Sequence, residues 1–379
     1  MEIYVVKSGD SVDSIATQFQ VPVESVIYNN QLVSPYRLAV GQALLVPSPS
    51  AAETLPGRPV FSGGYAYPYI VPDILDETLP WLTGLYVFSY GFNTEGMLIP
   101  PYPDDAFMID AAKKASVRPI LTLTPRDADN AFNNVLIHEV INSPETTAVL
   151  VDNLVDTVLE KGFMGVDLDF EYILPEDRQP YVEFVRKVRE AINATGYEVS
   201  VALAPKTSAD QRGTLYEGKD YRGLGEAADS VLLMTYEWGY TYGPPMAVAP
   251  INEVRRVVEY AISEIQPDKI NLGIPNYGYD WTLPFVQGQS RATAISLRYA
   301  VELAIENDAA IEFDQVAMSP FFRYTKDGIE HEVWFEDVRS LREKFALIDE
   351  YDLRGAVYWQ IMRFFRPNWI LLEDTFRIL

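Results

Sequence analysis

The alternation of short apolar runs with helix-like stretches limits most strongly what this chain of 379 residues can fold into. After residue 58, eight runs rich in β-branched and aromatic residues recur, most of them separated by segments whose apolar residues have helical spacing. The runs cover residues 60–63, 84–89, 118–123, 164–171, 198–204, 230–236, 270–275 and 355–360. Strands that alternate with helices form a parallel sheet through right-handed crossovers. The pattern therefore predicts an α/β fold.

Two α/β architectures fit this pattern. Eight β/α units in about 320 residues match the size of a closed (β/α)8 TIM barrel that carries one insertion. An open, doubly wound sheet is the alternative. The chain has neither a strand-linked G-x-G-x-x-G nor a G-x-x-x-x-G-K-[ST] motif, so the usual reasons for an open sheet are missing. We therefore expect the barrel to occupy residues 59–379.

The segment of about 282–353, between the seventh and eighth runs, is longer than a crossover helix needs. Within it, Asp327-Gly328 lies between two strand-like runs at 319–324 and 330–335, which is the pattern of a β-hairpin. We expect a small α+β insertion here that forms one wall of the cleft.

The first 48 residues have a different organisation. Apolar runs near each end of this segment indicate strands, and two stretches with helical spacing lie between them. Residues 49–58 are rich in Pro, Ser and Ala and have no hydrophobic period, which is typical of a linker. We expect a separate strand-helix-helix-strand domain over residues 1–48.

The most informative residues for function are the three acids in the fourth run. Side chains alternate between the two faces of a strand, so Asp167, Asp169 and Glu171 point the same way over about 13 Å. If the strand is a barrel strand, the acids point inward, share a proton and include one with a raised pKa, as a general acid needs. An exposed amphipathic strand and a D-x-D-x-E metal site are the alternatives.

Composition narrows the chemistry and the partners. The 54 acidic and 30 basic residues give a net charge of −24, which disfavours nucleic acid and anionic membranes but permits a neutral polysaccharide. The chain has no Cys and only two His, so thiolate, multi-His metal and Ser-His-Asp sites are disfavoured. No apolar run approaches about 18 residues, and the opening MEIYVVKSGD lacks the features of a cleavable signal peptide.

Residues 165–171 resemble the D-x-x-D-x-D-x-E signature of family 18 glycoside hydrolases, which are (β/α)8 barrels, with Met164 in place of the first Asp. Further segments resemble the family in the same order along the chain, namely 64–65, 234–237, 273–278 and Trp359. Residues 121–124 depart from the family's Ser-x-Gly-Gly pattern, and Glu237 stands where the family has Asp.

The resemblance implies a retaining, substrate-assisted hydrolysis of a β-linked N-acetylglucosamine. It assigns Glu171 as general acid and base, Asp169 to the acetamido N–H, Tyr236 to the acetamido oxygen, and Asp167 as proton partner of Asp169. It also implies a set of sugar-binding residues: Trp359, Tyr277, Glu237, Tyr65 and Asn276. No metal or cofactor is implied.

The N-terminal segment resembles the LysM carbohydrate-binding domain through residues 6–11, 15–16, 19, 29–30 and 41–47. That family binds glycans that contain N-acetylglucosamine, in a groove between two loops. The resemblance places Gly9, Asp10, Ser11 and Asn30 in this groove. Residues 9–11 also fit a simple turn and helix cap, and the sequence does not separate the two interpretations.

A chain that combines these two domains resembles bacterial spore-cortex N-acetylglucosaminidases. They imply a peptidoglycan hydrolase of the spore cortex or coat of a Gram-positive bacterium, made without a cleavable signal peptide and acting as a monomer. A chitinase or endo-β-N-acetylglucosaminidase and a non-catalytic glycan-binding protein of the spore coat are the alternatives.

Overall fold

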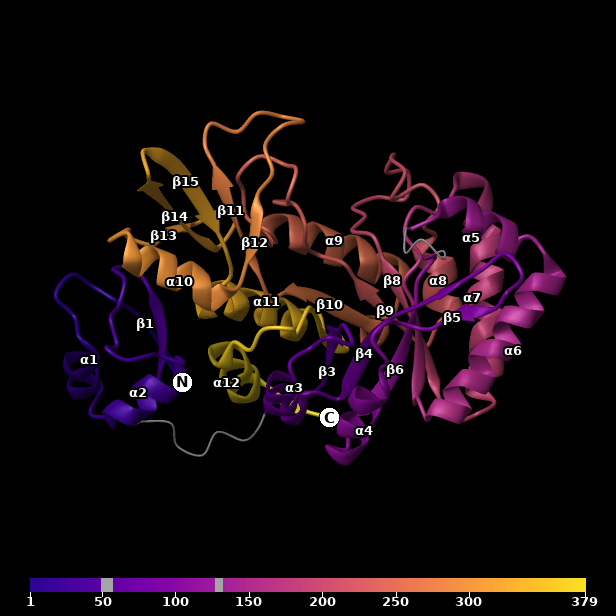
Figure 1. The fold of residues 1–379 in the computed structure, drawn as a ribbon, viewed down its shortest axis with the longest axis horizontal. Coiled ribbons are helices and arrows are strands. Elements are labelled where there is room, and N and C mark those ends of the chain that lie inside the picture. Colours follow the sequence, from indigo (N-terminus) through magenta and orange to yellow (C-terminus); the bar gives the residue numbers. More distant parts are fainter. Residues whose placement is uncertain (49–56, 127–131) are drawn as a thin grey trace.

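The computed structural model describes residues 1–48, 57–126 and 132–379 (Figure 1). Among these residues, eight parallel strands pair in a ring, and β3 closes it by pairing with both β4 and β16. The barrel strands are β3 Pro59–Ala66, β4 Gly84–Phe92, β6 Arg118–Leu123, β7 Gly165–Leu168, β8 Glu198–Leu203, β9 Ser230–Leu233, β10 Ile270–Pro275 and β16 Gly355–Trp359. The predicted TIM barrel is confirmed, and each of the eight predicted runs overlaps one of its strands.

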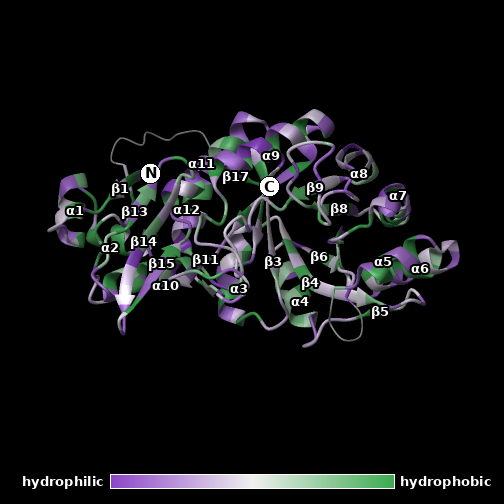
Figure 2. Ribbon diagram, turned by 90° about the horizontal axis from the view of Figure 1, so that it is seen from above, coloured by the Kyte–Doolittle hydropathy of each residue, from purple (hydrophilic) through white to green (hydrophobic). Residues whose placement is uncertain are grey.

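Helices cover the outside of this barrel and bury one apolar face against it. Figure 2 shows hydrophobic and hydrophilic residues alternating along α6, α7 and α9. The barrel helices are α3 Pro72–Thr78, α4 Ala106–Lys114, α5 Asn134–Ile141, α6 Pro144–Lys161, α7 Arg178–Asn193, α8 Tyr221–Ala227, α9 Ile251–Glu264, α11 Val338–Glu350 and α12 Arg366–Thr375. Within the described ranges, no helix is both long and apolar enough to cross a membrane.

Three short helical turns and two short strands complete this domain. The 3-10 turns are Leu79–Trp81, Pro175–Asp177 and Pro267–Lys269. β5 Leu98–Ile99 pairs antiparallel with β4, and β17 Arg377–Ile378 pairs parallel with β3. The end of the chain is therefore tied to the first strand of the barrel.

The predicted insertion is a five-stranded antiparallel sheet with one helix. Its elements are β11 Gly278–Thr282, β12 Thr293–Ile295, α10 Leu297–Glu306, β13 Glu312–Asp314, β14 Ser319–Lys326 and β15 Ile329–Trp334. Asp327 and Gly328 join β14 to β15 with φ of 52° and 80°, as a two-residue hairpin turn requires. The sheet begins before residue 282, and α11 packs against α9 and α12 as a barrel helix. The insertion is therefore shorter at its C-terminal end than predicted.

The N-terminal module, residues 1–48, has the predicted order of elements: β1 Glu2–Val5, α1 Val12–Phe19, α2 Val23–Asn29 and β2 Ala43–Val46. β1 and β2 pair antiparallel, and the two helices close a small core around Ile15, Val26 and Leu44. Of the predicted linker 49–58, residues 49–56 lie outside the described residues, so this boundary stays a prediction.

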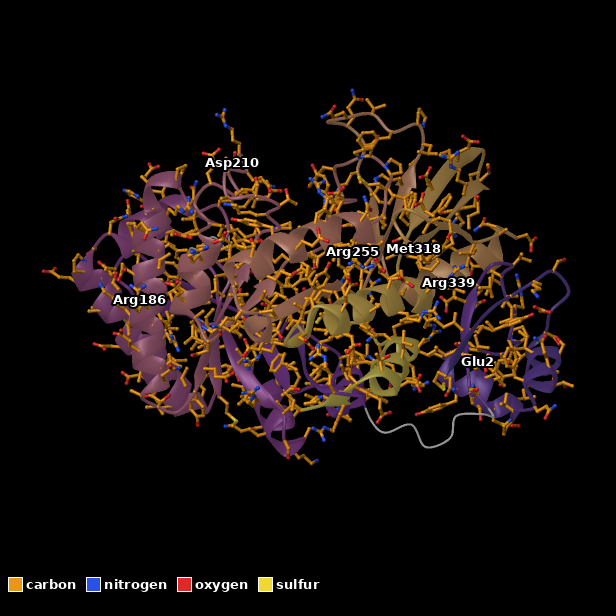
Figure 3. All side chains as sticks on the ribbon, turned by 180° about the vertical axis from the view of Figure 1, so that it is seen from behind. Glu2, Arg186, Asp210, Arg255, Met318 and Arg339 are labelled. Atoms are coloured by element: carbon orange, nitrogen blue, oxygen red, sulfur yellow. The ribbon has the colours of Figure 1, made fainter. Side chains whose placement is uncertain are left out.

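The module packs directly against the barrel and its insertion, beside α10 and α12 (Figure 1). The backbone N–H of Ile311 donates to the carbonyl of Val40 over 2.8 Å, and the Arg37 guanidinium donates to the carbonyl of Ile305 over 2.8 Å. Arg339, on the barrel side of the junction (Figure 3), donates to the carbonyl of Gly41. Leu45 is fully buried in the main core of the barrel.

Candidate active site

The three acids lie on the strand β7 and on the segment that follows it. The strand is shorter than predicted and ends at Leu168. Asp167 is fully buried on β7, and Asp169 and Glu171 follow on the segment that leaves its C-terminal end. The backbone N–H of Asp169 donates to the carbonyl of Leu123 over 3.0 Å, which keeps this segment beside β6. Phe170 faces the other way, in a stack with Tyr181 of α7. The alternation of faces therefore continues past the strand end.

Asp167 is held by two hydroxyl groups from neighbouring strands. Tyr65 on β3 donates to one carboxylate oxygen over 2.8 Å, and Ser200 on β8 donates to the other over 2.6 Å. Burial raises the pKa of Asp167 to about 6, although both hydrogen bonds favour the ionised form. Asp167 therefore gains or loses a proton close to neutral pH.

Asp169 and Glu171 lie close enough to affect each other's charge. Burial raises the pKa of Asp169 well above its usual value, and the neighbouring carboxylates of Glu171 and Asp167 raise it further. Burial also raises the pKa of Glu171. The Oδ1 atom of Asp169 has no hydrogen-bond partner among the described residues. Because like charges this close do not all ionise cheaply, the cluster retains protons near neutral pH.

Two cations that the sequence analysis missed lie beside the acids. Arg126 follows β6, lines the cavity above the acids and lies over the ring of Phe88 at 5.2 Å. Lys219 is fully buried in the loop before α8, where burial lowers its pKa to about 8. The position of Arg126 just after a barrel strand could have marked it as a candidate, because active sites of barrels open there. Lys219 has no such sequence signal.

Tyr236 and Glu237 follow β9, on the next wall of the cleft. The Tyr236 ring lines the same cavity as Asp169 and Glu171, and burial together with these two carboxylates raises the pKa of Tyr236. Glu237 has a left-handed backbone, with φ of 68°. Its carboxylate accepts hydrogen bonds from Tyr277 and, over 3.0 Å, from Tyr279 of β11. The insertion is therefore hydrogen-bonded to the rim of the barrel.

A cavity of about 640 Å³ gathers most of the predicted residues. Its lining residues include Tyr65, Arg126, Asp169, Glu171, Tyr236, Glu237 and Trp359. The Trp359 ring forms the end of an aromatic wall, in edge contacts with Tyr65 at 5.5 Å and Phe88 at 4.8 Å. Tyr277 lines a neighbouring cavity of about 230 Å³, which shares Glu237 and Trp359 with the first.

Asn276 also lines the smaller cavity, but its amide N–H2 group donates to the backbone carbonyls of Gln360 and Arg363. Asn276 therefore ties β10 to the segment after β16 through its amide nitrogen, and its contact with a sugar stays a prediction. Within the described part of the chain, no group of three or more His, Cys, Asp or Glu residues is arranged to hold a metal ion.

Of the four residues predicted to bind glycan in the N-terminal module, Gly9, Asp10 and Ser11 lie in the loop before α1, and Asn30 follows α2. Gly9 has φ of 89°, Asp10 accepts hydrogen bonds from Tyr4 and from the N–H of Lys7, and Ser11 caps α1. These residues form the turn and helix cap that the sequence left open as an alternative.

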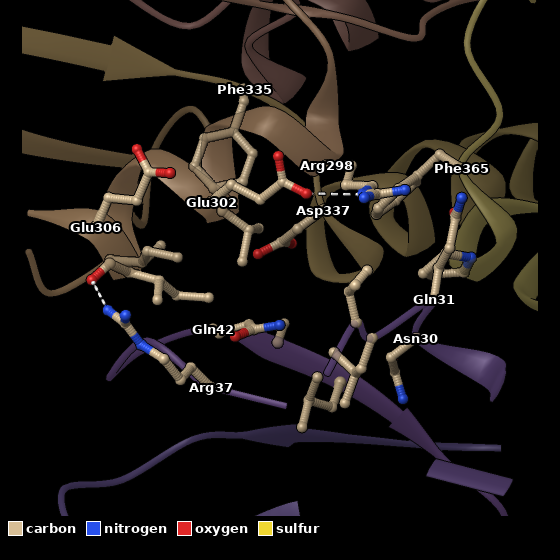
Figure 4. A pocket seen from close by; sticks show the side chains of 18 of the residues that line it. Asn30, Gln31, Arg37, Gln42, Arg298, Glu302, Glu306, Phe335, Asp337 and Phe365 are labelled. Atoms are coloured by element: carbon tan, nitrogen blue, oxygen red, sulfur yellow. Dashed lines mark hydrogen bonds and ion pairs between the residues drawn. The ribbon is translucent and has the colours of Figure 1, made fainter. Parts of the chain in front are cut away.

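Asn30 is buried, and both ends of its amide are bonded to backbone groups of Val26 and Leu45. Figure 4 shows Asn30 beside a cavity of about 290 Å³ between the module and the insertion, with Gln42 on one side and Glu302 on the other. The side-chain amide of Asn30 therefore joins α2 to β2, and its contact with glycan stays a prediction.

Comparison with known proteins adds a relationship over the whole chain. Residues 130–363 match the glycosyl hydrolases family 18, and residues 4–47 match the LysM domain. The cortical fragment-lytic enzyme of Bacillus subtilis (strain 168) is 37% identical over 100% of this chain and 99% of its own length.

Solved structures agree with these matches. The Bacillus megaterium QM B1551 spore cortex-lytic enzyme SleL is 35% identical, with a TM-score of 0.93 over 100% of this chain and 98% of that one. A chitinase from Chromobacterium violaceum ATCC 12472, at 23% identity and a TM-score of 0.74, covers 82% of this chain and 97% of its own and shares the fold.

Proposed function

The chain belongs to family 18 of the glycosyl hydrolases, and from this membership we propose that it is a β-N-acetylglucosaminidase that hydrolyses spore-cortex peptidoglycan with retention of configuration. The observation that carries the proposal is the cavity in which Asp169 and Glu171 meet Tyr236 and Trp359. The similarity to a cortical fragment-lytic enzyme and to SleL over the full length supports the cortex as the substrate.

The mechanism follows from the positions of the acids. Glu171 lies at the open end of the acid row and donates its proton to the glycosidic oxygen as the bond to the anomeric carbon breaks. The acetamido oxygen of the substrate attacks that carbon and forms an oxazolinium ion, so no enzymatic nucleophile is needed. Water then attacks the anomeric carbon from the face that the leaving group vacated and opens the oxazolinium ring, and Glu171, now ionised, accepts the proton of that water.

Asp169 and Tyr236 orient the acetamido group in this scheme. Asp169 accepts the acetamido N–H and stabilises the positive charge of the oxazolinium ion, and the Tyr236 hydroxyl donates to the acetamido oxygen. Asp167 exchanges a proton with Asp169 and therefore keeps Glu171 protonated until substrate binds. Trp359, Tyr65 and Tyr277 supply the apolar and hydroxyl surface that orients the sugar, and Glu237 binds it at the rim.

The first test removes the acid. Glu171→Gln keeps the size and hydrogen-bonding shape of the side chain, so the fold should persist while kcat falls about 10²- to 10⁴-fold on soluble cortex fragments. Glu237→Gln is the matched control, since it should raise KM more than it lowers kcat. Near-normal turnover by Glu171→Gln would remove Glu171 as the acid.

The second test identifies the bond that is cut. Digestion of purified spore cortex should yield products with N-acetylglucosamine at the new reducing end. Muramic acid at that end would contradict the proposed specificity, and faster turnover of chitin than of cortex would assign the chain to chitin instead.

We place the active protein in the spore, as a monomer, with the LysM domain bound to the same class of glycan.

A further inference from the structure

Lys219 is a buried cation that the mechanism above does not use. It lies in the loop that leads from β8 to α8, and its side chain is fully buried. Its ammonium donates to the carbonyl of Phe170 and, over 3.4 Å, to the carbonyl of Ala202 at the end of β8. Phe170 is the residue between Asp169 and Glu171. The ammonium is therefore hydrogen-bonded to the backbone between the two acids.

The surrounding loop is built to hold Lys219 in this place. The ammonium lies 5.2 Å from the centre of the Tyr181 ring, which stacks on Phe170, the residue that faces away from the acids. A side chain at Gly218 would place its Cβ 2.2 Å from the carbonyl oxygen of Ile173, so only glycine lets the loop approach the segment after Glu171 so closely. A second buried lysine, Lys206, donates to the carbonyl of Lys219 over 3.0 Å.

The charges around the acids are unbalanced without Lys219. Asp167, Asp169, Glu171 and Glu237 bring up to four negative charges to the cleft, and Arg126 in the cavity supplies one positive charge. Among the described residues, the Lys219 ammonium donates to the backbone carbonyls of Phe170 and Ala202 and forms no direct ion pair with a carboxylate. Burying a charge without such a partner is costly, so the row of acids is the partner that stabilises the ammonium.

We propose that Lys219 is a positioning residue of the active site, which holds the Phe170 carbonyl so that Asp169 and Glu171 face the cavity and offsets their negative charge from behind. The inference rests on the proposed function, because it assigns Lys219 a part in the reaction of those acids. It concerns the protonation of the acids, whereas the Glu171→Gln test concerns the identity of the acid.

The direction of the expected effect follows from the groups that face the two acids. These are Asp167 of β7, Tyr65 of β3, Tyr67 after β3, Arg126 after β6, Tyr172 after Glu171, Tyr181 of α7, Tyr236 and Glu237 after β9, and Lys219. Only Arg126 and Lys219 of this set favour the ionised acids by their charge. Removing Lys219 therefore raises the pKa of both Asp169 and Glu171. The acidic and the basic limb of the pH profile of kcat/KM both move to higher pH as a result.

The experiment compares Lys219→Met with Lys269→Met. Both changes replace a lysine whose ammonium donates to two backbone carbonyls, but Lys269 donates to the carbonyls of Gly225 and Ala228, which are not part of the acid segment. We expect the profile of kcat/KM for Lys219→Met to move by about one pH unit to higher pH, and that of Lys269→Met to stay at the wild-type position. Lys219→Arg, which keeps the charge, should restore the wild-type position. A profile that does not move, or that moves equally in both methionine variants, would overturn the proposal.

A second measurement leaves Lys219 in place, compares wild type with Glu171→Gln, and is decisive if Lys219→Met does not fold. The coupling is reciprocal, so loss of the Glu171 charge must lower the pKa of Lys219. In protein labelled with ¹⁵N-lysine, the Nζ titration of Lys219 should move to lower pH in Glu171→Gln by about one pH unit. An unchanged titration would overturn the proposal. Because this readout needs no turnover, it remains informative if the proposed hydrolysis itself is wrong.

Discussion

Asp167, Asp169 and Glu171 follow one another along one chain segment, yet each carboxyl group has a different environment. Asp167 accepts two hydroxyl hydrogen bonds, Asp169 has an oxygen without a partner among the described residues, and Glu171 faces the cavity. Burial opposes the charge of all three, and the hydrogen bonds offset it for Asp167 alone. The innermost acid is therefore the best stabilised as a carboxylate, and the outermost is the one that faces the cavity.

The raised pKa of Asp167 predicts a stability that depends on pH. Its pKa is about 6 in the fold against 3.8 in the unfolded chain, so the folded state binds more protons between these values and stability falls as pH rises through them. At about 1.4 kcal/mol for each pH unit, ionising Asp167 costs the fold about 3 kcal/mol. Asp167→Asn should therefore match wild type in thermal unfolding at pH 4 and exceed it at pH 7.5.

The control for this prediction is Asp13→Asn, on an exposed position of α1. Its melting temperature should follow that of wild type at every pH. If the difference between Asp167→Asn and wild type is the same at pH 4 and pH 7.5, Asp167 does not ionise in this range.

The shared orientation of the three acids could be predicted from the sequence, because the alternation of side chains along a strand depends only on local backbone geometry. Lys219 and Arg126 could not be predicted as a pair, because their approach to the acids depends on loops that the barrel brings together from distant parts of the chain. Asn30 and Asn276 show the opposite case, since they match family positions but donate their amide hydrogens to backbone carbonyls.

At the scale of elements, the contact between β9 and β10 sets the position of Tyr236. A Cβ atom at Gly273 of β10 would lie 2.3 Å from the carbonyl oxygen of Leu233 and 2.8 Å from Cε1 of Tyr236. Glycine at this position therefore lets the tyrosine ring turn toward the cavity.

The eight strands were predicted correctly because apolar runs are local, but the ends of β7 and of the insertion depend on tertiary pairing.

This contact predicts the effect of Gly273→Ala. The added methyl group must displace either the Leu233 backbone or the Tyr236 ring, so kcat should fall at least about tenfold and stability by about 1–3 kcal/mol. Gly288→Ala is the control, because Gly288 has φ of 78° but no atom within 4 Å of a new Cβ. It should lose about 1–2 kcal/mol of stability and no activity. Steady-state kinetics and thermal unfolding of both variants distinguish the two effects, and full activity in Gly273→Ala would contradict the first.

At the scale of the whole molecule, the N-terminal module is docked against the rest of the protein by direct contacts. Hydrogen bonds from Ile311, Arg37 and Arg339 join it to the insertion and to α11. Arg366 of α12 lies over the Tyr28 ring at 4.4 Å. The fold of the module was predictable from its own pattern, but this docking was not, because it joins surfaces far apart in the sequence.

Gly41 lies in this junction, close to the backbone of Ile311, and supplies a test of it. A Cβ atom at Gly41 would lie 1.9 Å from the carbonyl oxygen of Ile311, and φ is 82°. Gly41→Ala therefore has to separate the module from the insertion, and we expect the module to unfold before the barrel in differential scanning calorimetry. Hydrolysis of soluble cortex fragments should not change, because the acids and Tyr236 belong to the barrel.

Gly9→Ala is the matched variant for this test, because Gly9 has the same left-handed backbone, with φ of 89°, but nothing within 4 Å of a new Cβ. Both variants bear the same strain of about 1–2 kcal/mol within the module, so only the loss of docking separates them. Gly9→Ala should keep the unfolding of the module coupled to that of the barrel. Equal calorimetric traces for the two variants would mean that the close contact at Gly41 does not hold the module in place.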